Sequence, residues 1–376
     1  MSEGTDPRTV VRLTAPYPDL ATLGRRSLLR LRIEAGVETD RVLADLGSVG
    51  ATGVTRGESG SILLEGTLGD LMAGLGRAES GRPGREALLA VREVLERLSS
   101  PAPALRLGQT VWEFGERTYL LGVVNVTPDS FSGDGVGRSP EAAVARAMRL
   151  AEEGADAIDL GGESTRPGHR PITAEEEIGR VLPALELIAA EVQVPIFVDT
   201  SKAEVASAAL AAGADGVNDI WGLRRDPDMA QVVADAAAPV ICMHNHIGSD
   251  YLDLVGDVLA GLRQSLWLAE AAGIPRHGVV LDPGIGFGKT PAQNFEVLRR
   301  LCELKTLGCP ILVGTSRKSL IGWLLDERPV EGRLLGTAAT VAWSITAGAD
   351  IVRVHDVAEI RDVTRVMDAL ARRPPA

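Results

Sequence analysis

From about residue 110 onward, short apolar segments alternate with amphipathic helical segments, and this rhythm constrains the fold more than any other feature. Eight apolar segments have the length and composition of buried strands: 119–126, 157–162, 195–200, 215–220, 239–244, 278–283, 310–316 and 351–356. Helical patterns lie between them, for example at 139–155, 173–192, 202–214 and 294–308. Several of these helical segments end in glycine, which adopts the left-handed C-cap conformation without strain.

The number and spacing of these units predict an α/β fold of the (β/α)8 TIM-barrel type. Eight strand–helix units over about 265 residues match such a barrel in both number and length. A doubly wound open sheet is the alternative, but no Gly-x-Gly-x-x-Gly sequence follows the first strand. The stretch 110–120, just before that strand, is expected to be a hairpin that closes the bottom of the barrel.

The N-terminal part of the chain has a different character and predicts a separate, small α/β domain. Residues 28–36 have the pattern of a strand, 61–75 of a strand followed by a helix, and 85–98 of a helix. Prolines and small residues at 99–108 indicate a linker, so the expected domains are 1–98 and 109–376. The first domain contains no lysine, histidine or cysteine. Its role is unknown, and packing, dimerisation or regulation is expected rather than chemistry.

The composition excludes several classes of protein. The chain carries 39 Lys and Arg against 51 Asp and Glu, a net charge of −12, which argues against general binding of nucleic acid or anionic membranes. No apolar run reaches the roughly 18 residues of a membrane span, and no charged-then-apolar leader opens the chain. Three cysteines without metal-ligand spacing indicate reduced thiols. We therefore expect a cytoplasmic protein.

Nearly every predicted strand ends on a polar side chain. In a TIM barrel the active site lies at the carboxyl ends of the strands, so these side chains should gather around one cavity. Taken singly, Asp199 could cap the next helix, Asn218 and Asp219 could be turn residues, and His355 could be a buried, satisfied histidine. Taken together they indicate a site. The residues are Asn125, Glu163, Ser164, Thr165, Arg166, Asp199, Asn218, Asp219, Met243, His244, Asp282, Ser316, Arg317, Lys318, Arg353 and His355.

The chemistry of these strand ends falls into two groups. Asp199, Asn218 and Asp282 offer acceptors and an amide, which suit a flat heterocycle with an amino group and ring N–H donors, and Lys318 can supply a cation to it. The second group is rich in donors and suits phosphate or pyrophosphate; it consists of Asn125, Thr165, Arg166, Arg353 and His355. Mg²⁺ that bridges phosphate oxygens needs few protein ligands, and Asn125 is the candidate.

The glycine-rich stretch 281–290 resembles a phosphate loop but lacks the Walker A spacing. Its glycines are better explained by close passage of the backbone along a flat ligand, with Phe287 as an aromatic wall. No pair of histidines has zinc-ligand spacing, which argues against a transition-metal site.

Seven motifs occur in an order that resembles the dihydropteroate synthase family: "NVTPDSFS", "DLGGESTRPG", "VDTSK", "VNDI", "LDPGIGFGK", "GTSRKSLIG" and "RVHDV". The resemblance covers about residues 108–372 and leaves the N-terminal module outside. It implies condensation of 6-hydroxymethyl-7,8-dihydropterin pyrophosphate with p-aminobenzoate to give 7,8-dihydropteroate and pyrophosphate, in folate biosynthesis. It also implies ionisation of the C–O bond before capture by the arylamine, Mg²⁺ as cofactor, and a homodimer.

The resemblance also implies roles for individual residues. Lys318, Arg353, His355 and Asp199 would be catalytic. The pterin would be bound by Asp199, Asn218, Ile220, Met243, Asp282 and Lys318. The pyrophosphate would be bound by Thr165, Arg166, Arg353 and His355. The aminobenzoate would lie among Phe131, Pro167, Phe287 and Ser316, and Asn125 would lie beside the metal.

The sequence departs from the family at two places. After the fifth strand it has "MHNHIGSDYLDL" where Met-His-Met and a Gly-x-Pro turn are typical, and after the first strand it has "FSGDG" where "FSDGG" is commoner. Two alternative functions follow from the same barrel. A methyltetrahydrofolate–corrinoid methyltransferase would share the pterin-binding residues but would not need the Ser-Arg-Lys or Arg-x-His motifs. A non-catalytic pterin-binding paralogue would be favoured if the loops after the first and fifth strands had lost the family's motifs.

Overall fold

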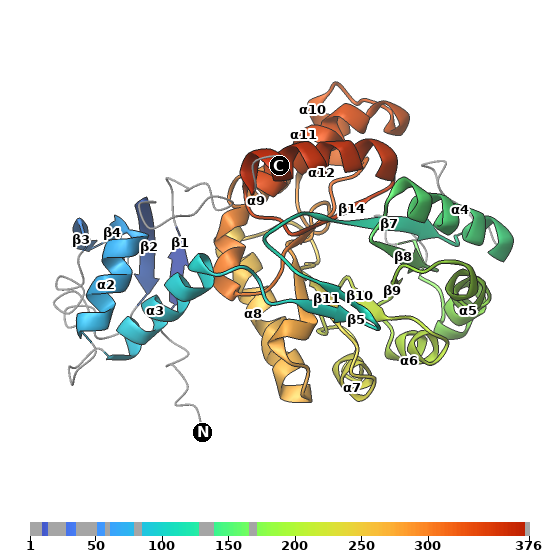
Figure 1. The fold of residues 1–376 in the computed structure, drawn as a ribbon, viewed down its shortest axis with the longest axis horizontal. Helices are drawn as coiled ribbons and strands as arrows, with labels where there is room; N and C mark the ends of the chain where they lie inside the picture. The colour runs from blue at the N-terminus through green and yellow to red at the C-terminus, as the bar shows by residue number, and fades with distance from the viewer. Residues whose placement is uncertain are drawn as a thin grey trace. The chain divides into compact units, whose positions relative to one another are not determined.

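The computed structural model describes residues 10–13, 28–34, 51–56, 61–78, 85–127, 139–164 and 171–372. Within these ranges the chain forms two compact units. The first unit consists of the described residues up to Ala102 together with two later segments, Arg300–Gly308 and Thr346–Gly348. The second contains the rest of the described residues from Pro103 onward (Figure 1).

The second unit is built on an eight-stranded parallel sheet. Its strands are β7 (Tyr119–Asn125), β8 (Ala157–Gly161), β9 (Ile196–Asp199), β10 (Gly216–Asp219), β11 (Val240–Met243), β12 (Val279–Asp282), β13 (Leu312–Val313) and β14 (Ile351–Val354). They pair in the order β12-β11-β10-β9-β8-β7-β14-β13. A parallel bridge from Leu281 to Ile311 joins the two ends of this order. The predicted (β/α)8 barrel is confirmed, and the open-sheet alternative is wrong.

Helices follow the strands and cover the outside of the barrel (Figure 1). They are α4 (Pro140–Glu153), α5 (Ala174–Glu191), α6 (Ala203–Ala211), α7 (Met229–Asp235), α8 (Leu254–Ala272), α9 (Pro291–Arg299), α10 (Ser319–Leu324), α11 (Leu334–Thr346) and α12 (Val357–Ala371). Local capping fixes several ends. Ser139 Oγ accepts from Ala142 N at the start of α4, and Gly154, with φ 103°, ends it.

Two boundaries differ from the sequence prediction. The segment 294–308 is not one helix: α9 ends at Arg299 and the 3₁₀ helix η5 (Leu301–Leu307) follows, with six of its seven residues buried. The predicted hairpin begins upstream of 110–120: its strands are β5 (Leu105–Leu107) and β6 (Thr110–Trp112), so the end of the predicted linker is a strand. Alternation of buried leucines around the exposed Arg106 sets β5, and Gly108, with φ 56°, permits the tight turn.

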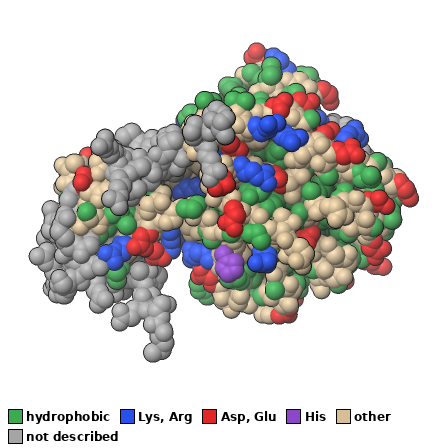
Figure 2. Space-filling model, viewed as in Figure 1, with side chains coloured by type: hydrophobic (Ala, Val, Ile, Leu, Met, Phe, Trp, Pro, Cys, Tyr) green, Lys and Arg blue, Asp and Glu red, His purple; other side chains and the backbone are tan. Residues whose placement is uncertain are grey.

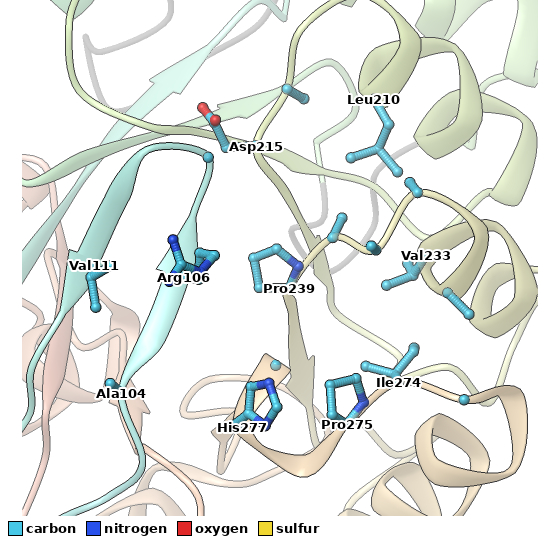
Figure 3. Close-up of a pocket in the computed structure, with 18 residues that line it drawn as sticks. Ala104, Arg106, Val111, Leu210, Asp215, Val233, Pro239, Ile274, Pro275 and His277 are labelled. Carbon is cyan, nitrogen blue, oxygen red and sulfur yellow. The ribbon is translucent and has the colours of Figure 1, made fainter.

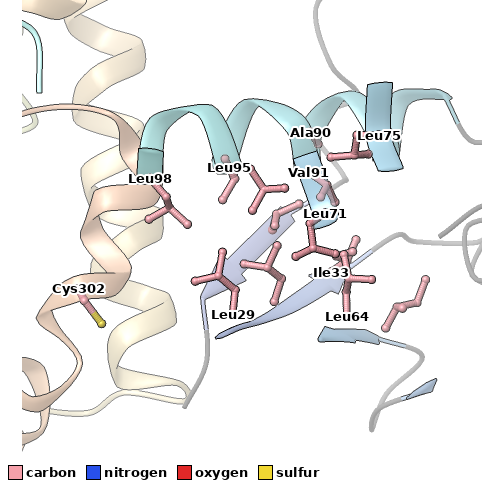
Figure 4. Packing of buried hydrophobic residues seen from close by; sticks show 14 residues of the cluster. Leu29, Ile33, Leu64, Leu71, Leu75, Ala90, Val91, Leu95, Leu98 and Cys302 are labelled. Atoms are coloured by element: carbon pink, nitrogen blue, oxygen red, sulfur yellow. The ribbon is translucent and has the colours of Figure 1, made fainter. Parts of the chain in front are cut away.

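The first unit is a four-stranded antiparallel sheet with two helices. The strands β1 (Val10–Leu13), β2 (Leu28–Glu34), β4 (Ile62–Thr67) and β3 (Gly53–Arg56) pair in that order, and α2 (Leu68–Ala78) and α3 (Arg85–Ser99) follow β4. The predicted strands at 28–36 and in 61–75 and both predicted helices are present, whereas β1 and β3 were not predicted. Alternate residues of β2 and β4 point into one core (Figure 4).

The core of the first unit is completed by η5. Cys302 belongs to the same buried cluster as Leu95 and Leu98 of α3 (Figure 4). Arg97 Nη1 donates to Thr306 O at 3.1 Å. A segment that lies between α9 and β13 in the sequence is therefore part of the packing of the N-terminal sheet.

The surface carries charges of both signs. Figure 2 shows acidic and basic side chains interspersed among apolar ones on the face in view. Within the described ranges, no helix combines the length and the apolar character needed to cross a bilayer.

Candidate active site

Strand register brings several of the predicted residues to one level at the carboxyl edge of the barrel. Asn125 lies opposite Gly161, and Gly161 lies opposite Asp199. Asp199 in turn lies opposite Asn218, and Met243 lies opposite Asp282. Because the strands are parallel, their carboxyl ends and the side chains there lie at the same edge of the sheet.

Arg353 of β14 is the centre of a buried cluster. Its Nε donates to Asp159 Oδ2, and its Nη2 donates to Asp199 Oδ2 at 2.9 Å. Asp159 is fully buried and also accepts from Asn218 Nδ2 at 3.1 and 3.2 Å. The Asp159 carboxylate thus joins Arg353 to Asn218, and the Arg353 guanidinium joins both to Asp199.

Asp159 was missed in the sequence analysis, although a signal was present. It stands in the middle of the apolar segment 157–162, where a lone carboxylate has no local partner. Buried charges need a partner to offset their loss of hydration, so a charged residue inside a strand indicates an unseen cation.

Asp199 combines a raised pKa with one carboxylate oxygen that has no partner among the described residues. Burial and the neighbouring Asp159 carboxylate raise the pKa of Asp199 to about 8, against the attraction of Arg353. Burial opposes the charge of Arg353, but Asp159 and Asp199 outweigh it, so the pKa of Arg353 is raised. Asp199 Oδ1 is buried and has no hydrogen-bond partner among the described residues. An N–H group of a ligand would satisfy that oxygen.

The cluster of Arg353, Asp159, Asp199 and Asn218 is the first wall of the site, and Asp282 and Lys318 form the second. Asp282 Oδ1 accepts from Gly284 N at 2.7 Å, and burial raises the pKa of Asp282 against the attraction of Lys318. Lys318 Nζ donates to Ile285 O and lies 4.8 Å from the centre of the Phe287 ring. Burial lowers the pKa of Lys318 to about 8; the Asp282 carboxylate opposes this shift, whereas the positive charge of Arg353 adds to it.

The two walls meet at Gly314. A Cβ atom built on Gly314 would lie 3.6 Å from Arg353 Cβ and 3.7 Å from Lys318 Nζ. The missing side chain therefore leaves room for two cationic side chains, and Arg353 and Lys318 lie side by side at the carboxyl edge of the barrel.

Asn125 and His355 lie in the same region. A Cβ atom on Gly161 would lie 3.2 Å from Asn125 Oδ1 and 3.8 Å from Asp199 Oδ2. His355 Nδ1 lies 2.9 Å from Ser316 Oγ, which also accepts from His355 N at 3.2 Å. His355 is half-buried, and these contacts to Ser316 satisfy part of its hydrogen-bonding capacity.

Two strand-end aspartates were also considered as a turn residue or a helix cap. Asp219 accepts from Trp221 N at 2.8 Å and Leu223 N at 2.6 Å, so it is a turn residue. Asp199 does not cap α6, whose N-cap is Lys202. Ile220 is half-buried and Met243 is buried at the ends of β10 and β11. Four predicted residues lie outside the described ranges: Phe131, Thr165, Arg166 and Pro167.

The residues present fit a magnesium ion held chiefly by phosphate oxygens. Among the described residues no group of three or more His, Cys, Asp or Glu could hold a metal. Asn125 Oδ1 is a carbonyl oxygen, the kind of hard ligand that Mg²⁺ accepts, and it adjoins Gly161, as does Asp199 Oδ2.

A cavity of about 690 Å³ lies at the opposite edge of the barrel (Figure 3). It is lined by the residues that precede β10, β11 and β12, including Asp215 and Pro239, and by Arg106 of the hairpin. None of the predicted site residues lines it. The chemistry is concentrated at the carboxyl edge.

The chain is similar to proteins of known family and structure. Residues 121–355 match the family of pterin binding enzymes. The dihydropteroate synthase of Clostridium beijerinckii is 45% identical over 270 residues, which cover 72% of this chain and 100% of that protein. The crystal structure of the Clostridium difficile enzyme in the presence of pteroic acid has a TM-score of 0.67, is 48% identical, and covers 70% of this chain and 100% of that one. The Xanthomonas albilineans enzyme with 4-aminobenzoic acid has a TM-score of 0.68 at 43% identity, covering 73% and 100%.

The barrel and the residues at its carboxyl edge define a pterin-binding enzyme, and the chain belongs to that family. The three proteins named above match over their whole length, and each is a dihydropteroate synthase. Within the family, the chain is a dihydropteroate synthase, a transferase of folate biosynthesis. The family match begins at residue 121, so the N-terminal part of the chain, up to Ala102, lies outside it.

Proposed function

We propose that the chain joins 6-hydroxymethyl-7,8-dihydropterin pyrophosphate to p-aminobenzoate, with release of 7,8-dihydropteroate and pyrophosphate. The observation that carries this proposal is the Arg353–Asp199–Asn218 cluster beside Lys318 and Asp282. Crystal structures of the Xanthomonas albilineans synthase contain 4-aminobenzoic acid or 7,8-dihydropteroate, which supports the same ligands here.

The pterin would be bound by the acceptors of the first wall. Asp199 Oδ1 is an unsatisfied acceptor, and Asp159 fixes the Asn218 amide from behind. Asp282 and Lys318 would bind the opposite polar edge of the ring, with Ile220 and Met243 as apolar contacts. This arrangement distinguishes a ring with N–H groups from one without, because an unpaired buried carboxylate oxygen is costly.

The pyrophosphate would be bound by Arg353 and His355, with Thr165 and Arg166 as further donors. The Nε and Nη2 atoms of Arg353 are engaged by Asp159 and Asp199, which leaves Nη1 for a phosphate oxygen. Asn125 would hold Mg²⁺ together with that phosphate. Bound Mg²⁺ would neutralise the charge that develops on pyrophosphate as it leaves.

The reaction needs leaving-group stabilisation rather than a strong base. The bond from the pterin methylene carbon to the pyrophosphate oxygen breaks, and the electron pair leaves with pyrophosphate. The arylamine nitrogen then forms a bond to the methylene cation and loses a proton. Fixed cations at the leaving group lower the barrier to such a step. Phe131, Pro167, Phe287 and Ser316 would surround the aminobenzoate.

We also propose a cytoplasmic homodimer. Trp323 and Leu324 of α10 and Leu335 and Trp343 of α11 are 48%, 59%, 83% and 49% exposed, an amount of apolar surface that favours a partner. The three cysteines are free and buried, as expected of a reducing compartment. Light scattering at several concentrations tests the dimer.

One assay tests the function. The protein is incubated with pterin pyrophosphate, p-aminobenzoate labelled in the ring, and Mg²⁺, and product and pyrophosphate are measured together. Equal amounts of dihydropteroate and pyrophosphate, formed only with Mg²⁺, are expected. Tight binding of pteroic acid without turnover would instead identify a non-catalytic paralogue.

A further inference from the structure

Lys289 lies at the end of the loop that follows β12, and three acceptors surround its amine. Its Nζ lies 3.0 Å from Gly284 O, 3.0 Å from Phe287 O and 3.2 Å from His244 Nδ1. An ammonium group has three N–H donors, so these partners use all of them. Two partners belong to the loop itself, and His244 directly follows β11.

The charge state of the pair is consistent with this geometry. Burial, reinforced by the positive charge of Lys289, lowers the pKa of His244 to about 2, so the imidazole is neutral and can offer Nδ1 as an acceptor. Burial lowers the pKa of Lys289 to about 7 against the attraction of Asp282. A neutral amine would keep the same contacts, because it can accept from a protonated Nδ1 while it donates to the two carbonyls.

The loop from Gly284 to Lys289 lies directly against the loop that follows β11. Gly284 and Gly288 have φ of 70° and 56°, and a Cβ atom on them would lie 1.9 Å from His244 O and 2.3 Å from His246 O. Only glycine permits this approach. Tyr251 Oη donates to Gly288 O at 2.8 Å and adds a further tie.

These contacts give a role to the unusual segment "MHNHIGSDYLDL". Tyr251 belongs to it, and its ring lies 5.1 Å from the ring of His246. Gln293 Nε2 donates to Ser249 O at 2.9 Å. The altered segment therefore contacts the glycine-rich loop through Tyr251 and the helix that follows this loop, α9, through Ser249.

The glycine-rich loop in turn contacts Lys318. It supplies the Ile285 carbonyl that accepts from Lys318 Nζ and the Phe287 ring beside that amine. A Cβ atom on Gly286 would lie 3.1 Å from Lys318 Cδ. The position of Lys318 and of the aromatic wall therefore depends on a loop conformation that Lys289 stabilises.

We propose that Lys289 is a positioning residue of the reaction: by tying His244 to the Gly284 and Phe287 carbonyls, it holds the glycine-rich loop against Lys318. Lys289 makes no contact with substrate in this role. The inference rests on the proposed function, because it assigns Lys318 and Phe287 to the pterin and the aminobenzoate.

The experiment compares Lys289→Met with Lys289→Ala. Methionine fills the space of the aliphatic stem without a donor, whereas alanine leaves a space that a small alkylamine can enter. We expect K289M to raise the KM for p-aminobenzoate and to weaken pteroic acid binding, each about tenfold, because three acceptors lose their donor. Added n-propylamine should restore at least part of the activity of K289A and none of that of K289M. Lys305→Met, the same change on η5, is the matched control.

The outcomes separate the two claims. A K289M protein that is folded by circular dichroism and within twofold of wild type in both KM and pteroic acid affinity overturns the inference, as does K289A that n-propylamine leaves unchanged. If K289M does not fold, Tyr251→Phe decides, because it removes one tie to the same loop and should raise the same KM about threefold. A wild-type chain without condensation activity overturns the proposed function itself.

Discussion

Asp159 and Arg353 are 194 residues apart in the sequence and form a buried ion pair at the carboxyl edge of the barrel. Through this pair, β8 and β14 hold a guanidinium that also reaches Asp199 of β9. Asp159 contacts Asn218 on its other side. Asp159 therefore links Arg353, which we propose binds pyrophosphate, to Asn218, which we propose binds the pterin.

Asp159→Asn should lower kcat/KM about 100-fold, since it removes one of the two carboxylates that hold Arg353. It should also move the acidic limb of the pH profile to lower pH, because the Asp159 charge helps to raise the pKa of Asp199. Steady-state rates across pH measure both effects. The exposed Asp362→Asn on α12 is the control, and an unmoved acidic limb would contradict the role of Asp159.

The pH dependence of kcat/KM should be bell-shaped with its maximum near pH 8. Asp199, with a raised pKa of about 8, is protonated below that pH and cannot accept fully from the pterin. Lys318, with a lowered pKa of about 8, loses its charge above it. Rates with saturating aminobenzoate, from about pH 6 to about pH 10, test this, and a flat profile would refute it.

Lys318→Ala and Arg353→Ala should each lower turnover about 100-fold or more while the fold persists, because both remove a fixed cation from the site. Turnover is measured with both substrates saturating, and circular dichroism checks the fold. Near-normal rates in either variant would show that the assigned site is wrong.

His244→Gln should make folding less sensitive to acid. The folded-state pKa of His244 is depressed from 6.5 to about 2, so between these values the unfolded chain binds the extra proton, and stability is lost as pH falls below 6.5. Each such proton changes the free energy of unfolding by about 1.4 kcal/mol per pH unit. Glutamine keeps an acceptor for Lys289. Urea unfolding near pH 5 and pH 7 should give a smaller difference than in wild type.

The sequence by itself determined the barrel and the set of residues at its carboxyl edge. Alternation of apolar and amphipathic segments is a local pattern, and parallel strands place their final residues on one side whatever the side-chain partners are. Asn125, Asp199, Asn218 and Arg353 could therefore be assigned to a single edge before any coordinates were known. β1 and β3 are short strands without a clear apolar pattern, so this pattern does not predict them.

Only the tertiary structure decided which hydrogen-bond and ion-pair partners each of these side chains has. Asp219 and Asn218 are neighbours with similar sequence signals, yet the first caps a local turn and the second contacts Asp159. The same holds for Lys289, whose three acceptors come from two loops. Hydrogen bonds and ion pairs depend on distances of a few tenths of an ångström between segments far apart in the chain. Those distances are set by strand register and loop packing, which no local pattern of residues records.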